Sequence, residues 1–180
     1  MIISSSTRRP VPINVGECCM CVAWSRASAA IASPRRQGQI ARMRQSGSTL
    51  RFDTPGKGLT DITRTVDRWL TSTGLSDGLL TLLCRHTSAS LLIQENAARA
   101  VQADLLAWFD RLAPEGDHYR HDDEGPDDMP AHLRTTLTGV NLQIPFAQGR
   151  MRLGTWQGIY LAEHRRMPHR REIAVHAIGD

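Results

Sequence analysis

Residues 119–132, YRHDDEGPDDMPAH, hold the densest group of side chains that could bind a metal ion. In this stretch His121 and His132 bracket five acidic residues, which are Asp122, Asp123, Glu124, Asp127 and Asp128. Neutral imidazoles and carboxylates are common protein ligands of zinc, manganese and magnesium. The spacing matches no sharp metal motif such as H-E-x-x-H. On composition alone, a solvated acidic loop with incidental histidines is therefore the simpler interpretation.

A second polar group, Arg85-His86-Thr87-Ser88, separates the apolar runs GLLTLL and LLIQEN. His86 could act as a general acid or base, as a metal ligand or as a donor to phosphate. Thr87 and Ser88, with free backbone N–H groups at a turn, could hold phosphate oxygens. A single histidine beside an apolar run is more often a hydrogen-bonded structural residue, so this group alone leaves both interpretations open.

Two further polar segments carry candidate residues. Glu95 and Asn96 follow the second apolar run, where Glu95 could favour the start of a helix and Asn96 could be its N-cap. The segment GTWQG places glycines on both sides of Thr155 and Gln157, within an expected strand. Glycine inside a strand often marks close approach by a ligand or another chain. A bulge around a core tryptophan explains the segment at least as well.

The distribution of charge limits the class of partner. The chain has 180 residues and a net charge of +4, but the basic excess lies in residues 1–50, with seven arginines against one acidic residue. Residues 51–180 carry a small acidic excess and so offer no sign of the basic face of a nucleic-acid binder. No apolar stretch approaches the roughly 18 residues of a membrane helix. We therefore expect neither nucleic acid nor a membrane as partner.

The cysteines and the C-terminal basic run give weaker signals. Three of the four cysteines crowd residues 18–21, and Cys84 stands alone, so neither a disulfide framework nor a paired zinc motif is present. A reducing cytoplasm is the simplest location. The run RRMPHRR, residues 165–171, is either a solvated turn between strands or the lining of an anionic pocket.

Hydrophobic periodicity predicts the elements that position these groups. We expect strands at 48–54, 78–84, 88–95, 140–146, 149–165 and 171–178, and helices at about 60–74, 96–112 and, briefly, within 129–139. Thr60 is the expected N-cap of the first helix. The strand at 88–95 could pair with that at 78–84. The second helix should face the sheet with Val101, Leu105, Trp108, Phe109 and Leu112.

The order of these elements indicates an α+β domain over residues 43–180. Its core should be strand-rich, with a largely antiparallel sheet or sandwich and two main helices. Residues 113–128 show no apolar period, and loops of that length are usually functional or disordered. Residues 1–42 are interpreted as a disordered tail or an over-extended start, with an organellar transit peptide as the alternative.

Four long segments together resemble the YjbQ-like family, whose members are linked to a secondary thiamine-phosphate synthase activity. They are GLLTLLCRHTSASLLIQENA, YRHDDEGPDDMPAHLRTTLTG, IPFAQGRMRLGTWQGIYLAEHR and REIAVHAI. The resemblance covers about residues 45–178 and implies a compact α+β fold assembled as a homotrimer. It also implies a pocket at subunit boundaries, where the His-Thr-Ser turn meets the acidic loop.

The resemblance further implies a reaction and a set of residues. The reaction joins hydroxymethylpyrimidine diphosphate to thiazole phosphate and releases pyrophosphate, with a divalent metal, Mg or Zn, as cofactor. Implied roles are catalysis by His86, Glu95, Asp128 and His132, substrate or anion binding by Arg85, Thr87, Ser88, Asn96, Thr155 and Gln157, and metal binding by His121, Asp128 and His132. Whether Asp127 or Asp128 takes the pocket role stays open.

Two other classes of function fit the same residues. One is a metal-dependent hydrolase of another phosphorylated metabolite, with the thiamine reaction as a side activity. The other is a non-enzymatic trimer that binds a metal or an anionic metabolite. The sequence alone does not separate these hypotheses from the transferase.

Overall fold

The computed structural model describes residues 42–180, so the prediction for residues 1–42 lies, apart from residue 42 itself, outside the described residues. Eight strands are present there: β1 Arg44–Thr54, β2 Gly58–Asp61, β3 Gly78–Cys84, β4 Ala89–Glu95, β5 Asn141–Ala147, β6 Arg150–Met151, β7 Gln157–Glu163 and β8 His169–Gly179. Three helices accompany them: α1 Thr63–Ser72, α2 Arg99–Leu112 and α3 Asp128–Thr138. The predicted α+β, strand-rich class is confirmed.

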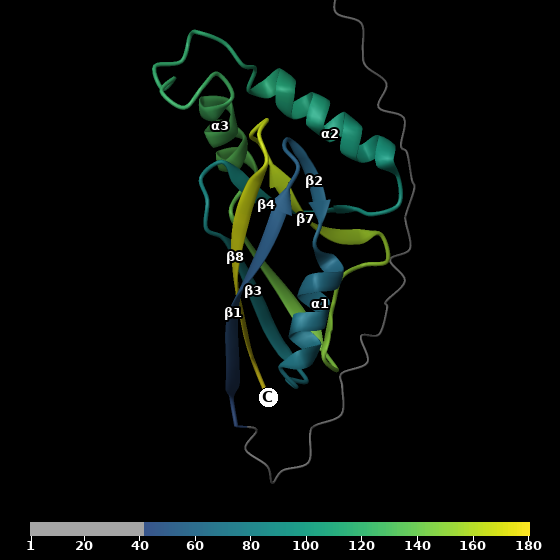
Figure 1. The fold of residues 1–180 in the computed structure, drawn as a ribbon. Helices are drawn as coiled ribbons and strands as arrows, with labels where there is room; N and C mark the ends of the chain where they lie inside the picture. The colour runs from purple at the N-terminus through teal and green to yellow at the C-terminus, as the bar shows by residue number, and fades with distance from the viewer. Residues whose placement is uncertain (1–41) are drawn as a thin grey trace, which may run out of the picture. The chain divides into compact units, whose positions relative to one another are not determined.

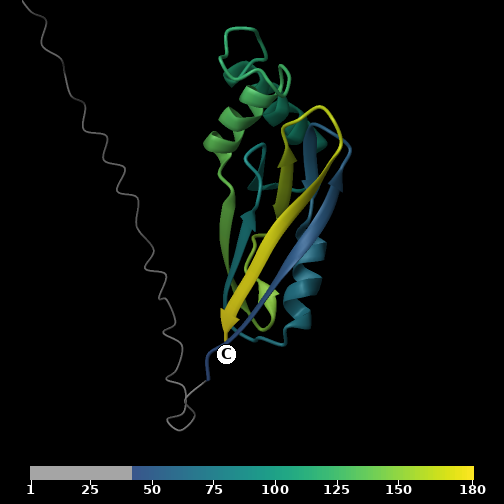
Figure 2. The same ribbon diagram turned by 60° about the vertical axis from the view of Figure 1, so that its left-hand side comes forward.

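The strands form two antiparallel sheets. The larger has the order β1-β8-β3-β5-β6 and the smaller the order β2-β7-β4. β1 and β8 pair along eleven residues each, and they run side by side down the molecule in Figures 1 and 2. The alternation in β8 buries Ile173, Val175 and Ala177 and turns the residues between them outward. The larger sheet therefore has one core face.

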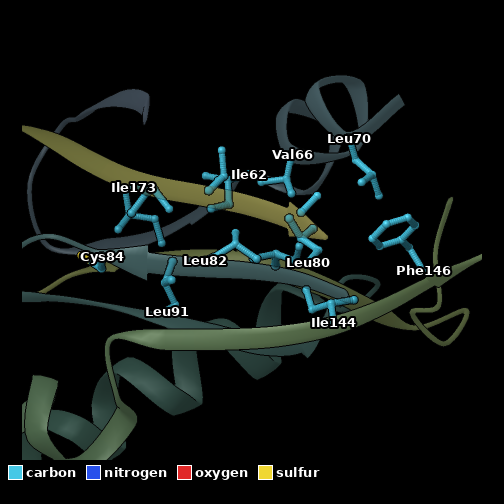
Figure 3. Close-up of a cluster of buried hydrophobic side chains, with 14 of the residues drawn as sticks. Ile62, Val66, Leu70, Leu80, Leu82, Cys84, Leu91, Ile144, Phe146 and Ile173 are labelled. Atoms are coloured by element: carbon cyan, nitrogen blue, oxygen red, sulfur yellow. The ribbon is translucent and has the colours of Figure 1, made fainter. Parts of the chain in front are cut away.

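The core lies between the two sheets. Leu80 and Leu82 of β3 meet Leu91 of β4, while Val66 and Leu70 of α1 close one side (Figure 3). β7 is buried at six consecutive positions, which is typical of a strand covered on both faces. One face of β7 packs into this core, and the other meets α2, where Phe109 lies edge-on to His164.

α2 and α3 lie at the end of the domain away from the C-terminus (Figures 1 and 2). α2 contributes one fully buried side chain, Phe109, whereas Trp108 and Leu112 are 44% and 49% exposed. The predicted inner face is therefore too wide, because the helix presents only a narrow stripe to β7. Arg134 of α3 donates to the carbonyl of Ala113 and so fixes where α2 ends.

Several predicted boundaries are wrong for local reasons. α1 begins at Thr63, where the carboxylate of Asp61 accepts the Thr63 N–H, so Thr60 is not its N-cap. α2 begins only at Arg99, so Asn96 does not cap it. Within the described range, β3 and β4 belong to different sheets rather than pairing. The expected strand over 149–165 is divided into β6 and β7, because residues 152–156 form an exposed connection.

No helix within residues 42–180 has both the length and the apolar character that crossing a bilayer requires.

Candidate metal centre

Three of the predicted metal ligands converge at the start of α3. Asp128 Oδ2 lies 2.8 Å from His121 Nε2 and 3.3 Å from His132 Nε2. All three ligand atoms lie within 4.8 Å of one another. Asp128 and His132 share one helix face because they are four residues apart, and His121 reaches them from the acidic loop. In the part of the chain that the structure describes, this is the one such group found.

The donor set suits a divalent ion of the zinc type. Two imidazole nitrogens and one carboxylate oxygen leave an open coordination position, as in catalytic zinc sites. Bonds of about 2.1 Å place ligands roughly 3.4 Å apart in a tetrahedron. The distance from Asp128 to His132 is close to that value, whereas the distance to His121 is that of a direct hydrogen bond. The side chain of His121 is 45% exposed and free to adjust, whereas that of Asp128 is 3% exposed.

The backbone of the HTS turn, residues 86–88, sets which ring nitrogen of His132 carries the proton. His132 Nδ1 lies 3.0 Å from the carbonyl oxygen of Thr87, which can only accept a hydrogen bond. Nδ1 therefore carries the proton, and in the neutral ring Nε2 keeps its lone pair toward Asp128. A hydrogen bond of this kind, on the far nitrogen of the ring, orients metal-binding histidines in general. The contact also joins the predicted turn to the acidic loop.

Asp127 and Asp128 both contact Arg165, but only Asp128 also contacts the two histidines. The carboxylate of Asp127 accepts the backbone N–H of Arg166 at 2.8 Å and Arg165 Nε at 3.1 Å. Burial by itself would raise the pKa of Asp127, but these hydrogen bonds outweigh it and hold the pKa below its ordinary value. Of the two, Asp128 is therefore the residue placed with the histidines.

Two hollows beside the HTS turn have hydroxyl side chains among their lining residues. One of about 420 Å³ is lined by Thr87, His132, Thr135, Thr136, Gly139, Val140 and Asn141. The other, of about 440 Å³, is lined by Cys84, Arg85, His86, Thr87, Ser88 and Val140. Because both include Thr87 and Val140, they adjoin. The oxygen Oγ1 of Thr135 is buried and has no hydrogen-bond partner among residues 42–180.

His86 is held by the sheet. Its Nε2 accepts the backbone N–H of Glu172 at 2.8 Å, so this nitrogen is not free to bind a metal or take a substrate proton. Burial and the nearby Arg171 lower the pKa of His86. The neutral ring that results carries its proton on Nδ1. The side chain of Arg85 forms an exposed ion pair with Glu172.

The remaining predicted residues lie at the other end of β4. Glu95 is the last residue of β4 and pairs with Gln157, the first of β7. Seven strand residues span about 20 Å, so the structure does not bring this end to the histidine cluster. Asn96 Nδ2 donates to the carbonyl of Gln157, and Thr155 is exposed in the preceding connection. A hollow of about 450 Å³ lies against Glu95 and Gln157.

Comparisons with known proteins agree with this fold. Residues 48–180 match the family model described as UPF0047 protein YjbQ-like. The chain belongs to the YjbQ-like family. It is 48% identical to the UPF0047 protein sll1880 of Synechocystis over 78% of this chain and 96% of that protein.

Two solved structures extend the likeness of this YjbQ-like chain. The conserved hypothetical protein TT1486 of Thermus thermophilus is 38% identical, with a TM-score of 0.62 over 71% of this chain and 97% of its own. A YbjQ-like protein of unknown function from Sulfolobus solfataricus shares the fold, with a TM-score of 0.72 at 24% identity over 77% of this chain and all of its own.

Sequence reasoning missed the polar interior of this YjbQ-like domain. Ser90 Oγ lies 2.8 Å from His164 Nε2, and burial lowers the pKa of His164 to about 4. Arg171 pairs with Glu163 in the core. Burial would raise the pKa of Glu163, but hydrogen bonds from Arg171, the backbone N–H of Arg165 and the hydroxyl of Thr54 hold this pKa below its ordinary value. The sequence signal for this pair was a charged residue at a core-facing position in each of two strands, Glu163 in β7 and Arg171 in β8.

Proposed function

We propose that this YjbQ-like protein is a metal-assisted transferase that makes thiamine phosphate from hydroxymethylpyrimidine diphosphate and thiazole phosphate. The observation that carries the proposal is the convergence of His121, Asp128 and His132 beside a hollow whose lining includes threonine and asparagine side chains. The family resemblance supplies the identity of the substrates. A phosphorylated substrate suits the hollows, because hydroxyl and amide groups donate hydrogen bonds to phosphate oxygens.

The proposed cofactor is a divalent ion of the zinc type rather than magnesium. Magnesium prefers an octahedral set of oxygens, whereas imidazole nitrogens suit zinc. Two of the three ligands here are imidazoles. When bound, the ion would act as a Lewis acid toward the oxygens of the diphosphate.

The chain's own residues would bind and orient the diphosphate. In the reaction, the C–O bond between the pyrimidine methylene and the diphosphate breaks, pyrophosphate leaves with the electron pair, and the thiazole nitrogen forms the new C–N bond. Thr87 offers a hydroxyl donor next to His132, whereas the hydroxyl of Thr136 already donates to the carbonyl of His132. The Nδ1–H of His86 is a neutral donor on the neighbouring hollow. Such donors stabilise the charge that develops on a leaving group.

Assembly as a homotrimer is part of the proposal. Glu95 and Gln157 lie about 20 Å along β4 from the metal end of the same chain. If they serve the same site as His132, they must come from another copy. Mixing inactive Glu95→Ala and His132→Ala subunits after reversible dissociation tests this, because mixed trimers would contain some intact composite sites. Activity recovered in the mixture supports the composite site, and no recovery argues against it.

Elemental analysis of purified protein is the first test of the proposal. We expect about one zinc-type ion per chain, with loss in His121→Ala and in His132→Ala. His118→Ala is the matched control, because His118 lies in the same loop and forms no hydrogen bond or ion pair within the described residues. Equal metal content in all four proteins would remove the acidic loop from the site.

Activity is the second test. Purified protein given both precursors should form thiamine phosphate, and His132→Ala should lose the activity while His118→Ala keeps it. Turnover of other phosphate esters without thiamine phosphate would favour the hydrolase instead. Retained metal and tight ligand binding without any turnover would favour a binding protein.

We place the protein in the cytoplasm, consistent with the buried free thiol of Cys84.

A further inference from the structure

Arg165 contacts the acidic loop at several points. Its Nε donates to Asp127 Oδ2 at 3.1 Å, its Nη1 contacts Asp128 Oδ1, and its Nη2 donates to the carbonyl of Glu124 at 2.7 Å. Nη1 also lies 3.4 Å from the carboxylate of Glu124. The side chain is 12% exposed, so these contacts are partly shielded from water. One guanidinium thus contacts three acidic residues.

The turn that carries Arg165 is itself fixed. The Arg165 backbone N–H donates to Glu163 Oε1 at 3.0 Å, and Glu163 is buried against Arg171. Burial would lower the pKa of Arg165, but its hydrogen bonds to the carboxylates raise it above its ordinary value, so the side chain stays charged. The guanidinium is therefore held in place from both ends.

The position of the guanidinium decides how Asp128 can bind a cation. Arg165 lies on Oδ1, so only Oδ2, between His121 and His132, remains available. The carboxylate of Asp128 can then bind a cation only through one oxygen, in monodentate fashion. Arg165 also takes one oxygen of Asp127, whose same oxygen accepts the backbone N–H of Arg166. Hard ions such as magnesium and calcium need several oxygens, and Arg165 engages the second oxygen that Asp128 could offer.

We propose that Arg165 is a positioning residue that makes the His121–Asp128–His132 centre selective for zinc-type ions over magnesium and calcium. It does so by engaging the second carboxylate oxygen of Asp128, which a hard ion would need, and by fixing the plane of that carboxylate. This inference rests on the metal centre of the proposed function. It adds a residue from the β7–β8 turn, 37 positions from Asp128 in sequence.

The test compares metal affinities of apo protein by isothermal titration with zinc, magnesium and calcium salts. Arg165→Met should weaken zinc binding about 10- to 100-fold, the usual effect of removing a residue that holds a metal ligand in place, and should strengthen magnesium and calcium binding. Arg165→Lys, which keeps the charge but not the forked geometry, should lie between. Arg166→Met is the matched control, because its side chain pairs with Glu115 and leaves its backbone N–H on Asp127.

The ratio of zinc to magnesium affinity separates positioning from a purely structural role. A residue needed only for folding would lower the affinity for every ion, and Arg165→Lys keeps the test usable if Arg165→Met does not fold. An unchanged ratio in both variants overturns the inference and leaves the metal centre standing. Wild-type protein that binds no zinc overturns both.

Discussion

Removing the charge of Glu163 should destabilise the domain more than removing any surface ion pair. Its side chain is fully buried and accepts Arg171 Nε at 2.7 Å, Arg171 Nη2 at 2.5 Å and Thr54 Oγ1 at 2.8 Å. Glu163→Gln would leave the buried guanidinium of Arg171 without its counter-charge. Breaking one partner of a buried pair costs about 3–5 kcal/mol. With a urea m-value of about 2 kcal/mol/M, the midpoint should fall by about 2 M.

The assay is urea unfolding at fixed protein concentration and pH 7, followed by circular dichroism. Arg150→Ala is the control, because Arg150 is 74% exposed and its pair with Asp67 should be worth about 0–1 kcal/mol. Replacing both Glu163 and Arg171 by methionine should recover part of the loss, since both buried charges of this pair are then removed. A cost below about 1 kcal/mol for Glu163→Gln would refute the reasoning.

Three other perturbations test the interior. The pKa of His164 is lowered from 6.5 to about 4. Because the unfolded chain takes up the proton first, the free energy of unfolding should fall by roughly 3 kcal/mol between about pH 6.5 and about pH 4. Urea unfolding at several pH values should show this slope, and His164→Gln should lack it. Burial raises the pKa of Cys84 to about 11, so alkylation by iodoacetamide at pH 8, read by peptide mass spectrometry, should be about 100-fold slower than in urea. Gly56→Ala should destabilise the domain by about 2 kcal/mol, since Gly56 has φ +130° and an added Cβ would lie 2.3 Å from the carbonyl oxygen of Arg166. Gly58→Ala is the control, because its Cβ would approach no atom closer than 3.9 Å. Equal stability of the two variants would contradict this prediction.

Local patterns predicted most of the fold because burial alternates along several of the strands. The alternation of Ile173 and Val175 in β8, and of Leu142 and Ile144 in β5, identifies strands with one core face. Pairing was harder to predict. β3 and β4 are adjacent in sequence and both apolar, but the turn between them carries the chain from one sheet to the other. Apolar content alone does not distinguish a hairpin from two stacked strands.

The starts of the helices also escaped prediction, because N-cap preferences give way to tertiary contacts. Asn96 looks like an N-cap, but its side chain instead donates to the carbonyl of Gln157. Its backbone N–H likewise bonds to the carbonyl of Trp156, so Asn96 is part of the contact between the ends of β4 and β7. A polar residue after a strand can satisfy the sheet before it satisfies a helix.

The choice between Asp127 and Asp128 was within reach of the sequence. If residues 128–138 form a helix, the residue four positions before His132 is Asp128, and the residue four positions after Asp127 is Ala131, which is buried. Helical spacing therefore pairs Asp128 with His132 and turns Asp127 elsewhere. Helical spacing does not predict which residue contacts the remaining carboxylate oxygens of Asp127 and Asp128. That partner, Arg165, comes from the turn between β7 and β8, and only the tertiary fold brings that turn to the acidic loop. Helical spacing thus brings together two of the candidate ligands, Asp128 and His132, whereas the number of oxygens that Asp128 offers depends on contacts between distant parts of the chain.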